Sequence, residues 1–375
     1  MDEAPTAPVG RAGRRGGDGA REPGERPMFA ALDLGTNNCR LLIATPTGRG
    51  FRIVDAFSRI VRLGEGLSGS GRLGEAAMGR AIGALRVCAG KITRRGVTRV
   101  KAVATEACRS AANGPRFLSE VAEQTGLRLT VISPRQEARL SVACCLTLLD
   151  RAPLAALVVD VGGGSTEMSW VDLRAPGLGA ASGRAAPGRP PIAAWLSIPV
   201  GVVTLAERFP ERAGDGDAWF RSMVEAMKSR IGAFRGAEAW RAVFASGGAH
   251  LVGTSGAITS LAGLHLGLAR YDRAQVDGLW MTRAECDAVT RRLAALTVGE
   301  RAAQPCIGPD RADLVMAGAA ILAAVQELWP CERVRVADRG LREGLLLSLM
   351  AEHGSRRRRR MAGAPRGAPP ERAPP

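Results

Sequence analysis

The sequence is poor in histidine, in paired cysteines and in long apolar runs, and each shortage excludes a class of protein. It has three histidines in 375 residues and no CxxC spacing, so local ligands cannot assemble a zinc cluster. No stretch approaches the roughly 18 consecutive apolar residues of a membrane span. The segment before Met28 lacks the apolar core of a secretory signal. We therefore expect a cytoplasmic protein with no membrane partner.

The cysteines are spread along the chain in apolar surroundings. There are eight: Cys39, Cys88, Cys108, Cys144, Cys145, Cys286, Cys306 and Cys331. This distribution predicts buried thiols in a reducing compartment, and we assign none of them to a site.

Positive charge is concentrated near the C-terminus. The formal net charge is +16, and residues 355–375 carry seven arginines against one acid, with five arginines in a row at Arg356–Arg360. Such a run among Pro, Gly and Ala is typical of a solvated end, so we predict disordered tails at residues 1–27 and 353–375. An arm that attracts nucleic acid or another polyanion is the less favoured alternative.

Strand patterns alternate with helical patterns in both halves of the chain. The strand patterns cover Phe29–Leu32, Leu41–Thr45, Phe51–Leu63, Val100–Ala104, Leu157–Asp160, Glu167–Val171 and Ala194–Ile198. The helical patterns cover Gly74–Arg94, Pro115–Gln124, Pro134–Leu149, Val203–Phe209 and Ala218–Phe234. The alternation indicates an α/β fold with domains over residues 28–150 and 151–352. The Gly/Pro-rich stretch Ala175–Pro191 is predicted to be a surface loop that joins two strands.

Two glycine turns match each other without a gap. Residues 30–43 read AALDLGTNNCRLLI, and residues 157–170 read LVVDVGGGSTEMSW. Each is a strand, an Asp-x-Gly turn with small polar residues and a second strand, with Asp33 and Asp160 in equivalent places. The match indicates a duplicated unit, in which each of two similar domains begins with a β-hairpin.

The composition of these turns suits phosphate. Glycines let successive backbone N–H groups converge on an anion, and hydroxyl groups add donors. An aspartate would repel a bare phosphate, and an intervening Mg²⁺ resolves that conflict. The predicted phosphate-binding residues are Asp33, Gly35, Thr36 and Asn37 in the first turn and Gly162, Gly163, Gly164, Ser165 and Thr166 in the second. A tight hairpin with solvated acids is the alternative.

A third glycine element lies where a short strand pattern meets a helical one. Free N–H groups at the helix start and two hydroxyls would form another phosphate site. Its residues are Gly253, Thr254, Ser255 and Gly256. An ordinary strand-to-helix turn with a serine cap is an equally good interpretation.

Six short motifs follow one another between Phe29 and Met350. They are DLGTNNCR at 33–40, ATEACR at 104–109, ISPRQEA at 132–138, DVGGGSTE at 160–167, GTSG at 253–256 and GLREG at 340–344. In this order they resemble the motifs of the exopolyphosphatase and guanosine pentaphosphate phosphohydrolase (Ppx/GppA) family. The resemblance implies the fold of actin, Hsp70 and sugar kinases, with two ribonuclease-H-like domains around a cleft.

The resemblance also implies Mg²⁺-assisted hydrolysis of a terminal phosphoanhydride, in inorganic polyphosphate or in guanosine pentaphosphate. By the motif match, Glu137 orients or deprotonates the attacking water, and Asp160 and Glu167, together with Glu137, hold the metal. Phosphoryl transfer also needs cations on the equatorial oxygens, for which Arg40 and Arg109 are the candidates.

The sequence departs from the family pattern at Pro134, where the family often has Gly, and at Gln136, where it often has Glu. The motifs end near Met350, which corresponds to a short, two-domain form without the HD-type domain of longer members. A polyphosphate or guanosine tetraphosphate sensor and a kinase of the same fold are the alternative functions. The choice between the two substrates, and whether the chain forms a homodimer, stay open.

Overall fold

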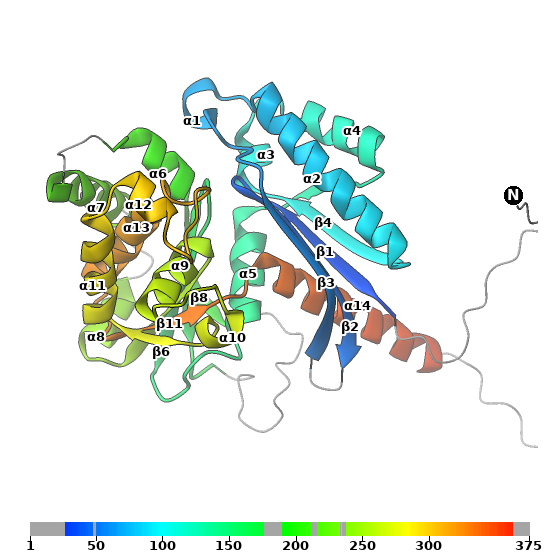
Figure 1. Cartoon of the computed structure of the whole chain (residues 1–375). Coiled ribbons are helices and arrows are strands. Elements are labelled where there is room, and N and C mark those ends of the chain that lie inside the picture. The colour runs from blue at the N-terminus through cyan, green and yellow to red at the C-terminus, as the bar shows by residue number, and fades with distance from the viewer. Residues whose placement is uncertain are drawn as a thin grey trace, which may run out of the picture.

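The protein forms two lobes, each built on one mixed sheet (Figure 1). The computed structural model describes residues 27–47, 50–175, 190–211, 216–232, 234 and 238–362. The predicted loop at Ala175–Pro191 falls almost entirely outside these residues, but the strands that flank it are antiparallel neighbours in one sheet.

The first lobe contains a sheet of strand order β3-β2-β1-β4-β5. Its strands are β1 (Phe29–Leu34), β2 (Asn38–Thr47), β3 (Gly50–Ile60), β4 (Arg99–Ala104) and β5 (Thr130–Val131). Its helices are α1 (Leu67–Ser70), α2 (Glu75–Arg94), α3 (Glu106–Ser110) and α4 (Gly114–Thr125). Strands β1 to β3 are antiparallel neighbours, whereas β4 runs parallel to β1 and β5 parallel to β4.

Strand β1 is apolar except at Asp33, because both of its faces are covered. Ala30 and Leu32 pack in a cluster with α2 and α4. Phe29 and Ala31 point to the opposite face and pack against α14 (Leu341–Ala362).

The second lobe contains a sheet of strand order β10-β11-β9-β6-β7-β8. Its strands are β6 (Ala155–Val161), β7 (Thr166–Asp172), β8 (Ile192–Ile198), β9 (Ala249–Thr254), β10 (Trp280–Thr282) and β11 (Arg333–Ala337). Its helices are α6 (Val202–Arg208), α7 (Gly216–Gly232), α8 (Glu238–Ala245), α9 (Gly256–His265), α10 (Arg273–Val276), α11 (Arg283–Ala294), α12 (Val298–Ala302) and α13 (Val315–Leu328).

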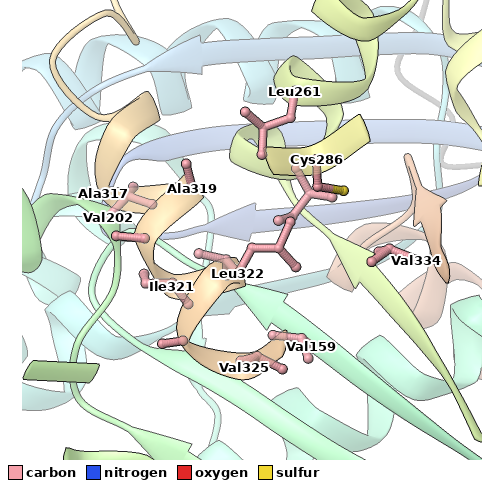
Figure 2. Close-up of a cluster of buried hydrophobic side chains, with 14 of the residues drawn as sticks. Val159, Val202, Leu261, Cys286, Ala317, Ala319, Ile321, Leu322, Val325 and Val334 are labelled. Carbon is pink, nitrogen blue, oxygen red and sulfur yellow. The ribbon is translucent and has the colours of Figure 1, made fainter. Parts of the chain in front are cut away.

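The core of the second lobe lies between its sheet and α13. Figure 2 shows Ile321, Leu322 and Val325 of α13 beside Val159 of β6, within one buried apolar cluster. Val158, the next residue of β6, faces the other side of the sheet and joins a separate cluster. Both sheet faces are therefore buried, as the continuous apolar pattern of β6 requires.

The two sheets share one plan. Strand order β3-β2-β1-β4-β5 in the first lobe corresponds to β8-β7-β6-β9-β11 in the second, and β10 is an addition at the edge. In each sheet the first two strands form an antiparallel hairpin, and the strand beside the first one runs parallel to it. The predicted fold class, two duplicated α/β domains of the actin and sugar-kinase type, is confirmed.

Two helices cross between the lobes, and they change the predicted domain limits. Helix α5 (Pro134–Cys145), which we placed in the domain ending at residue 150, packs through Val142 and Cys145 on the second sheet. Helix α14, which we placed in the second domain, covers the first sheet (red in Figure 1). The boundary between the lobes therefore does not fall at a single chain position, because each of these helices packs on the sheet of the lobe to which we had not assigned it.

The C-terminal segment differs from the prediction as well. We expected disorder from residue 353, but α14 continues through Arg356–Arg360 and ends at Ala362. Residues 363–375 and 1–26 lie outside the described part of the chain.

The predicted burial of the cysteines is confirmed, since all eight are buried and carry free thiols. Among the described residues, no helix is both long and apolar enough to span a membrane.

Candidate active site

A cavity of about 510 Å³ lies where the two glycine hairpins meet. Its walls come from both lobes: the β1–β2 and β6–β7 turns, α5, the β9–α9 turn and the start of α14. Of the predicted residues it is lined by Asp33, Gly35, Thr36, Asn37, Arg40, Glu137, Asp160, Gly162, Gly163, Gly164, Ser165, Glu167, Thr254, Ser255 and Gly256. Sequence motifs scattered over more than 200 residues therefore converge on one place.

The first hairpin combines an acid with a base. The Gly35 N–H donates to the Asn38 carbonyl at 2.9 Å and closes the turn. Asp33 lies opposite Arg40 in the β1–β2 register. Burial raises the pKa of Asp33 to about 6, although the positive charge of Arg40 works against the rise. Within the described chain, the Arg40 guanidinium makes no hydrogen bond or ion pair, so it is available to a ligand.

The second hairpin has two acids in the same positions. The Gly162 N–H donates to the Ser165 carbonyl at 2.9 Å, and Asp160 lies opposite Glu167. Ser141 on α5 donates to Asp160 at 2.7 Å, and Ser197 on β8 donates to Glu167 at 2.8 Å. Burial and the neighbouring Asp160 raise the pKa of Glu167 to about 8, and burial also raises the pKa of Asp160.

The glycines of the second hairpin are needed for the contact between the hairpins. A Cβ at Gly163 would come within 3.0 Å of Asn37, and a Cβ at Gly164 would come within 2.5 Å of the Thr36 hydroxyl. The sequence suggested that these glycines serve to free N–H groups for an anion. The structure adds a steric reason, because any side chain there would push the two phosphate turns apart.

Each hairpin is braced by backbone hydrogen bonds from a neighbouring segment. Residues 61–68, here called the strap, support the first hairpin through donation from Val61 and Arg62 N–H to the Asn37 carbonyl. The strap also reaches the second lobe, where Arg62 forms an ion pair with Asp313 at 2.8 Å. The start of α6 supports the second hairpin, because the Val202 N–H donates to the Gly162 carbonyl at 3.0 Å.

Glu137 faces the second hairpin from the first turn of α5. Ser133 caps this helix, and the Gln136 side chain accepts from the Ser133 N–H at 3.1 Å in a capping box. Gln136, a departure from the family pattern, therefore has a structural role at the helix start. Glu137 is 9% exposed, and burial, followed by the nearby Glu167, raises its pKa well above the usual range.

Three further arginines that line the cavity, Arg311, Arg339 and Arg342, were missed by the sequence analysis. Arg339 is paired with Asp277. Arg311 lies beside Gly256 and donates to Ser260 at 3.4 Å, and Arg342 opens α14. Burial lowers the pKa of the Arg311 and Arg342 guanidinium groups. Arg342 belongs to the quoted GLREG motif and could have been chosen, whereas Arg311 stands in no motif.

Three predicted residues lie outside the cavity lining. Thr166 is fully buried, and its hydroxyl donates to the Val200 carbonyl at 2.8 Å. Gly253 lies inside β9, where a Cβ would meet Ile258 at 3.0 Å. Arg109 turns away from the cavity toward Glu106 and the Ile132 carbonyl. These positions support structural or positioning roles rather than contact with a phosphate.

The third glycine element is strained at its serine. Ser255 has φ 109°, a left-handed value that side chains rarely adopt, and it caps α9. Its hydroxyl is buried without a hydrogen-bond partner among the described residues. Strain and an unpaired donor together are typical of a ligand site, which favours the phosphate interpretation over an ordinary turn.

The profile of the Ppx/GppA phosphatase family matches residues 42–353, which is most of the chain. The chain belongs to the Ppx/GppA phosphatase family. It is 30% identical over 340 residues to "Exopolyphosphatase 2" of Mycobacterium tuberculosis, covering 85% of this chain and 98% of that protein. It is 29% identical to "Guanosine-5'-triphosphate,3'-diphosphate pyrophosphatase" of Aeromonas hydrophila, covering 87% of this chain and 60% of that longer protein.

Solved Ppx/GppA structures share the fold. A crystal structure of an exopolyphosphatase-like protein matches with a TM-score of 0.74 and 29% identity, covering 88% of this chain and 99% of the other. The Aquifex aeolicus Ppx/GppA family member matches with a TM-score of 0.69 and 27% identity, again covering 88% and 99%. The predicted membership and fold are therefore confirmed over nearly the whole folded part of the chain.

The carboxylates in the cavity of this Ppx/GppA protein suit a magnesium ion, which would take its remaining ligands from substrate and water. Among the described residues, no three Asp, Glu, His or Cys side chains form a metal site by themselves, so the predicted trio of Asp160, Glu167 and Glu137 is not a closed cage. Mg²⁺ typically takes one or two carboxylates plus phosphate oxygens and waters. The buried, like-charged pair of Asp160 and Glu167 suits that role, because a cation would relieve their repulsion.

Proposed function

We propose that the protein is a phosphohydrolase that removes the terminal phosphate from inorganic polyphosphate, guanosine pentaphosphate or both, by Mg²⁺-assisted attack of water. One observation carries the proposal. A single cavity is lined by both glycine turns, by arginines such as Arg40, and by the buried carboxylates Glu137 and Glu167, whose pKa values are raised. Phosphoryl transfer needs both sets of groups, to hold the anion and to activate water.

The anion would be held by the backbone N–H groups of the two hairpins and by Arg40, Arg311 and Arg342. The N–H groups are fixed before the substrate arrives, because both turns are closed by internal hydrogen bonds and accept further backbone hydrogen bonds from neighbouring segments. Preorganised donors stabilise the charge that develops on the equatorial oxygens without a reorganisation cost during the reaction.

Asp160 and Glu167 would hold the Mg²⁺, which when bound neutralises phosphate charge and orients the anhydride. Glu137 would accept the proton of the attacking water. Its burial supports this role, because a raised pKa makes the carboxylate a stronger base. Ser141 and Ser197 orient Asp160 and Glu167 through the hydrogen bonds described above.

The names of the two relatives support both substrates. One is called an exopolyphosphatase and the other a guanosine pentaphosphate pyrophosphatase. A phosphate-binding site contacts anhydride oxygens common to both molecules, so these contacts alone do not separate them. We also propose a cytoplasmic location, which the eight free thiols favour.

The test is phosphate release by the purified full chain with Mg²⁺, on long-chain polyphosphate and on guanosine pentaphosphate in parallel. We expect release from at least one, and none when EDTA removes the metal. Tight binding of either compound without release would contradict hydrolysis and support a sensor.

A further inference from the structure

Arg109 is shared between two carboxylates. Its Nε donates to Glu106 Oε2 at 3.0 Å, and its Nη2 donates to the same oxygen. Its Nη1 donates to the Ile132 carbonyl at 2.7 Å and reaches Glu137 Oε2 at only 3.4 Å. The strong contacts of Arg109 are therefore made with Glu106 and the backbone, and the contact with Glu137 is long.

Glu106 is held through both of its carboxylate oxygens. It lies in the first turn of α3, where its second oxygen accepts a hydrogen bond from Ser110. Its side chain is 15% exposed and lies against the second hairpin, since a Cβ at Gly164 would meet Glu106 Cγ at 3.2 Å. A carboxylate fixed in this way can fix the guanidinium that it binds.

Glu106 does not line the main cavity. It borders a second hollow of about 340 Å³, together with Pro134, Trp195, Leu196, Ser197 and Pro199. Ser197, on the same wall, donates to Glu167 at 2.8 Å. Glu106 and Ser197 therefore both line this second hollow. Glu106 holds Glu137 through Arg109, and Ser197 holds Glu167 directly. Both of the glutamates that are held, Glu137 and Glu167, line the main cavity.

We propose that Glu106 is a positioning residue, which fixes Arg109 and thereby aims the Glu137 carboxylate into the cavity. This inference rests on the proposed hydrolysis. Within the described chain, Arg109 is the sole hydrogen-bond partner of the Glu137 side chain, which leaves Oε1 of Glu137 available to a water molecule. Without Glu106, the Arg109 guanidinium would move toward Glu137 and shift its carboxylate away from the position that faces the cavity.

A purely structural ion pair on α3 is the competing explanation, and it makes a different prediction. Loss of a structural pair would lower the melting temperature and leave turnover of the folded enzyme intact. Loss of a positioning group would lower kcat with KM almost unchanged, because neither Glu106 nor Arg109 lines the cavity.

The experiment compares kcat and KM for phosphate release by the wild type, Glu106→Gln, Arg109→Met and the double variant, on polyphosphate and guanosine pentaphosphate with Mg²⁺. Glu75→Gln is the matched control, since it removes an exposed carboxylate partner of Arg116 at 2.6 Å in the same lobe. For Glu106→Gln we expect a loss in kcat of roughly 10- to 100-fold, typical of groups that orient a reacting side chain. KM should stay within about twofold, and Glu75→Gln should match the wild type.

The double variant tests the coupling. If Glu106 acts through Arg109, the double variant should lose no more activity than Arg109→Met alone. Multiplying losses, or a Glu106→Gln enzyme with wild-type kcat, would overturn the positioning role while leaving hydrolysis intact. No release by the wild type would instead overturn the proposed function, and the positioning role with it.

If Glu106→Gln does not fold, Arg109→Lys tests the same positioning role. Lysine keeps the charge beside Glu137 but lacks the planar fork that contacts Glu106, Glu137 and the Ile132 carbonyl together. We expect a lower kcat at unchanged KM, and a wild-type kcat would contradict the proposal.

Discussion

The two glycine hairpins have the same backbone plan and opposite charge balance. In both, an aspartate is the second-to-last residue of the first strand and lies opposite the residue seven places later. That residue is Arg40 in the first hairpin and Glu167 in the second. The residue at this one duplicated position therefore makes the first turn suited to an anion and the second turn suited to a cation.

The braces of the two hairpins differ in a related way. The strap holds the first hairpin and spans to the opposite lobe through Arg62 and Asp313. The second hairpin is held within its own lobe by α6, and its acids are held by Ser141 and Ser197.

The largest effect is expected at Glu137, which faces the acidic hairpin. Glu137→Gln keeps the shape of the side chain but cannot accept a proton, so kcat should fall by about 10²- to 10⁴-fold. KM should change little, because the phosphate contacts remain. The measurement is steady-state phosphate release, with Glu123→Gln on exposed α4 as the control. Near-normal kcat would refute the role of Glu137.

The next largest effect is expected to distinguish Asp160 from Asp33. Asp160→Asn should raise the Mg²⁺ concentration for half-maximal activity by roughly tenfold or more, because a metal-holding group is lost. Asp33→Asn, the equivalent change in the first hairpin, should shift it far less. Magnesium titrations of both variants provide the comparison. Equal shifts in the Mg²⁺ concentration for half-maximal activity would show that the two hairpins do not have separate roles in binding metal and phosphate.

A smaller effect concerns the contact between the hairpins. Gly164→Ala places a methyl within 2.5 Å of the Thr36 hydroxyl and should destabilise the fold by about 1–3 kcal/mol. At Gly35 the nearest atom to such a methyl is the Asn38 carbonyl at 3.5 Å, an ordinary contact, so Gly35→Ala should cost less. Urea unfolding of both variants measures the difference. Equal stability would contradict the tight packing of the turns.

The smallest effect is a pH dependence of stability in metal-free buffer. A raised carboxyl pKa means that the folded state holds the proton more tightly, so this stabilisation is complete at low pH and is lost as pH rises through the folded value. For Glu167 the loss should extend to about pH 8, and for Asp33 to about pH 6. Glu167→Gln should therefore be more stable than the wild type at pH 8, by a margin that grows as the pH rises from about 4.5 to about 8.

The comparison variant for that measurement is Asp33→Asn, whose gain should level off nearer pH 6. Thermal unfolding at several pH values gives both curves. A Glu167→Gln gain that does not grow with pH would contradict the burial of an uncompensated charge at this position.

The glycine hairpins could be predicted because their signals are local: glycine, aspartate and hydroxyl residues at fixed spacing. Glu137 was identified through the resemblance of residues 132–138 to a family motif. The positions of Arg109, Thr166 and Gly253 outside the cavity lining could not be predicted, since each depends on how the lobes assemble. Arg311 enters the cavity from a segment without a motif. The crossing of α5 and α14 was also hidden, because an apolar helix face does not specify which sheet it covers.

The most direct test of the division between the hairpins is a crystal structure of Glu137→Gln with Mn²⁺ and tripolyphosphate, with the metal located by its anomalous signal. We predict a metal peak at Asp160 and Glu167, with the terminal phosphate against the turns near Arg40. A metal peak beside Asp33 instead, or phosphate bound away from both turns, would contradict the account.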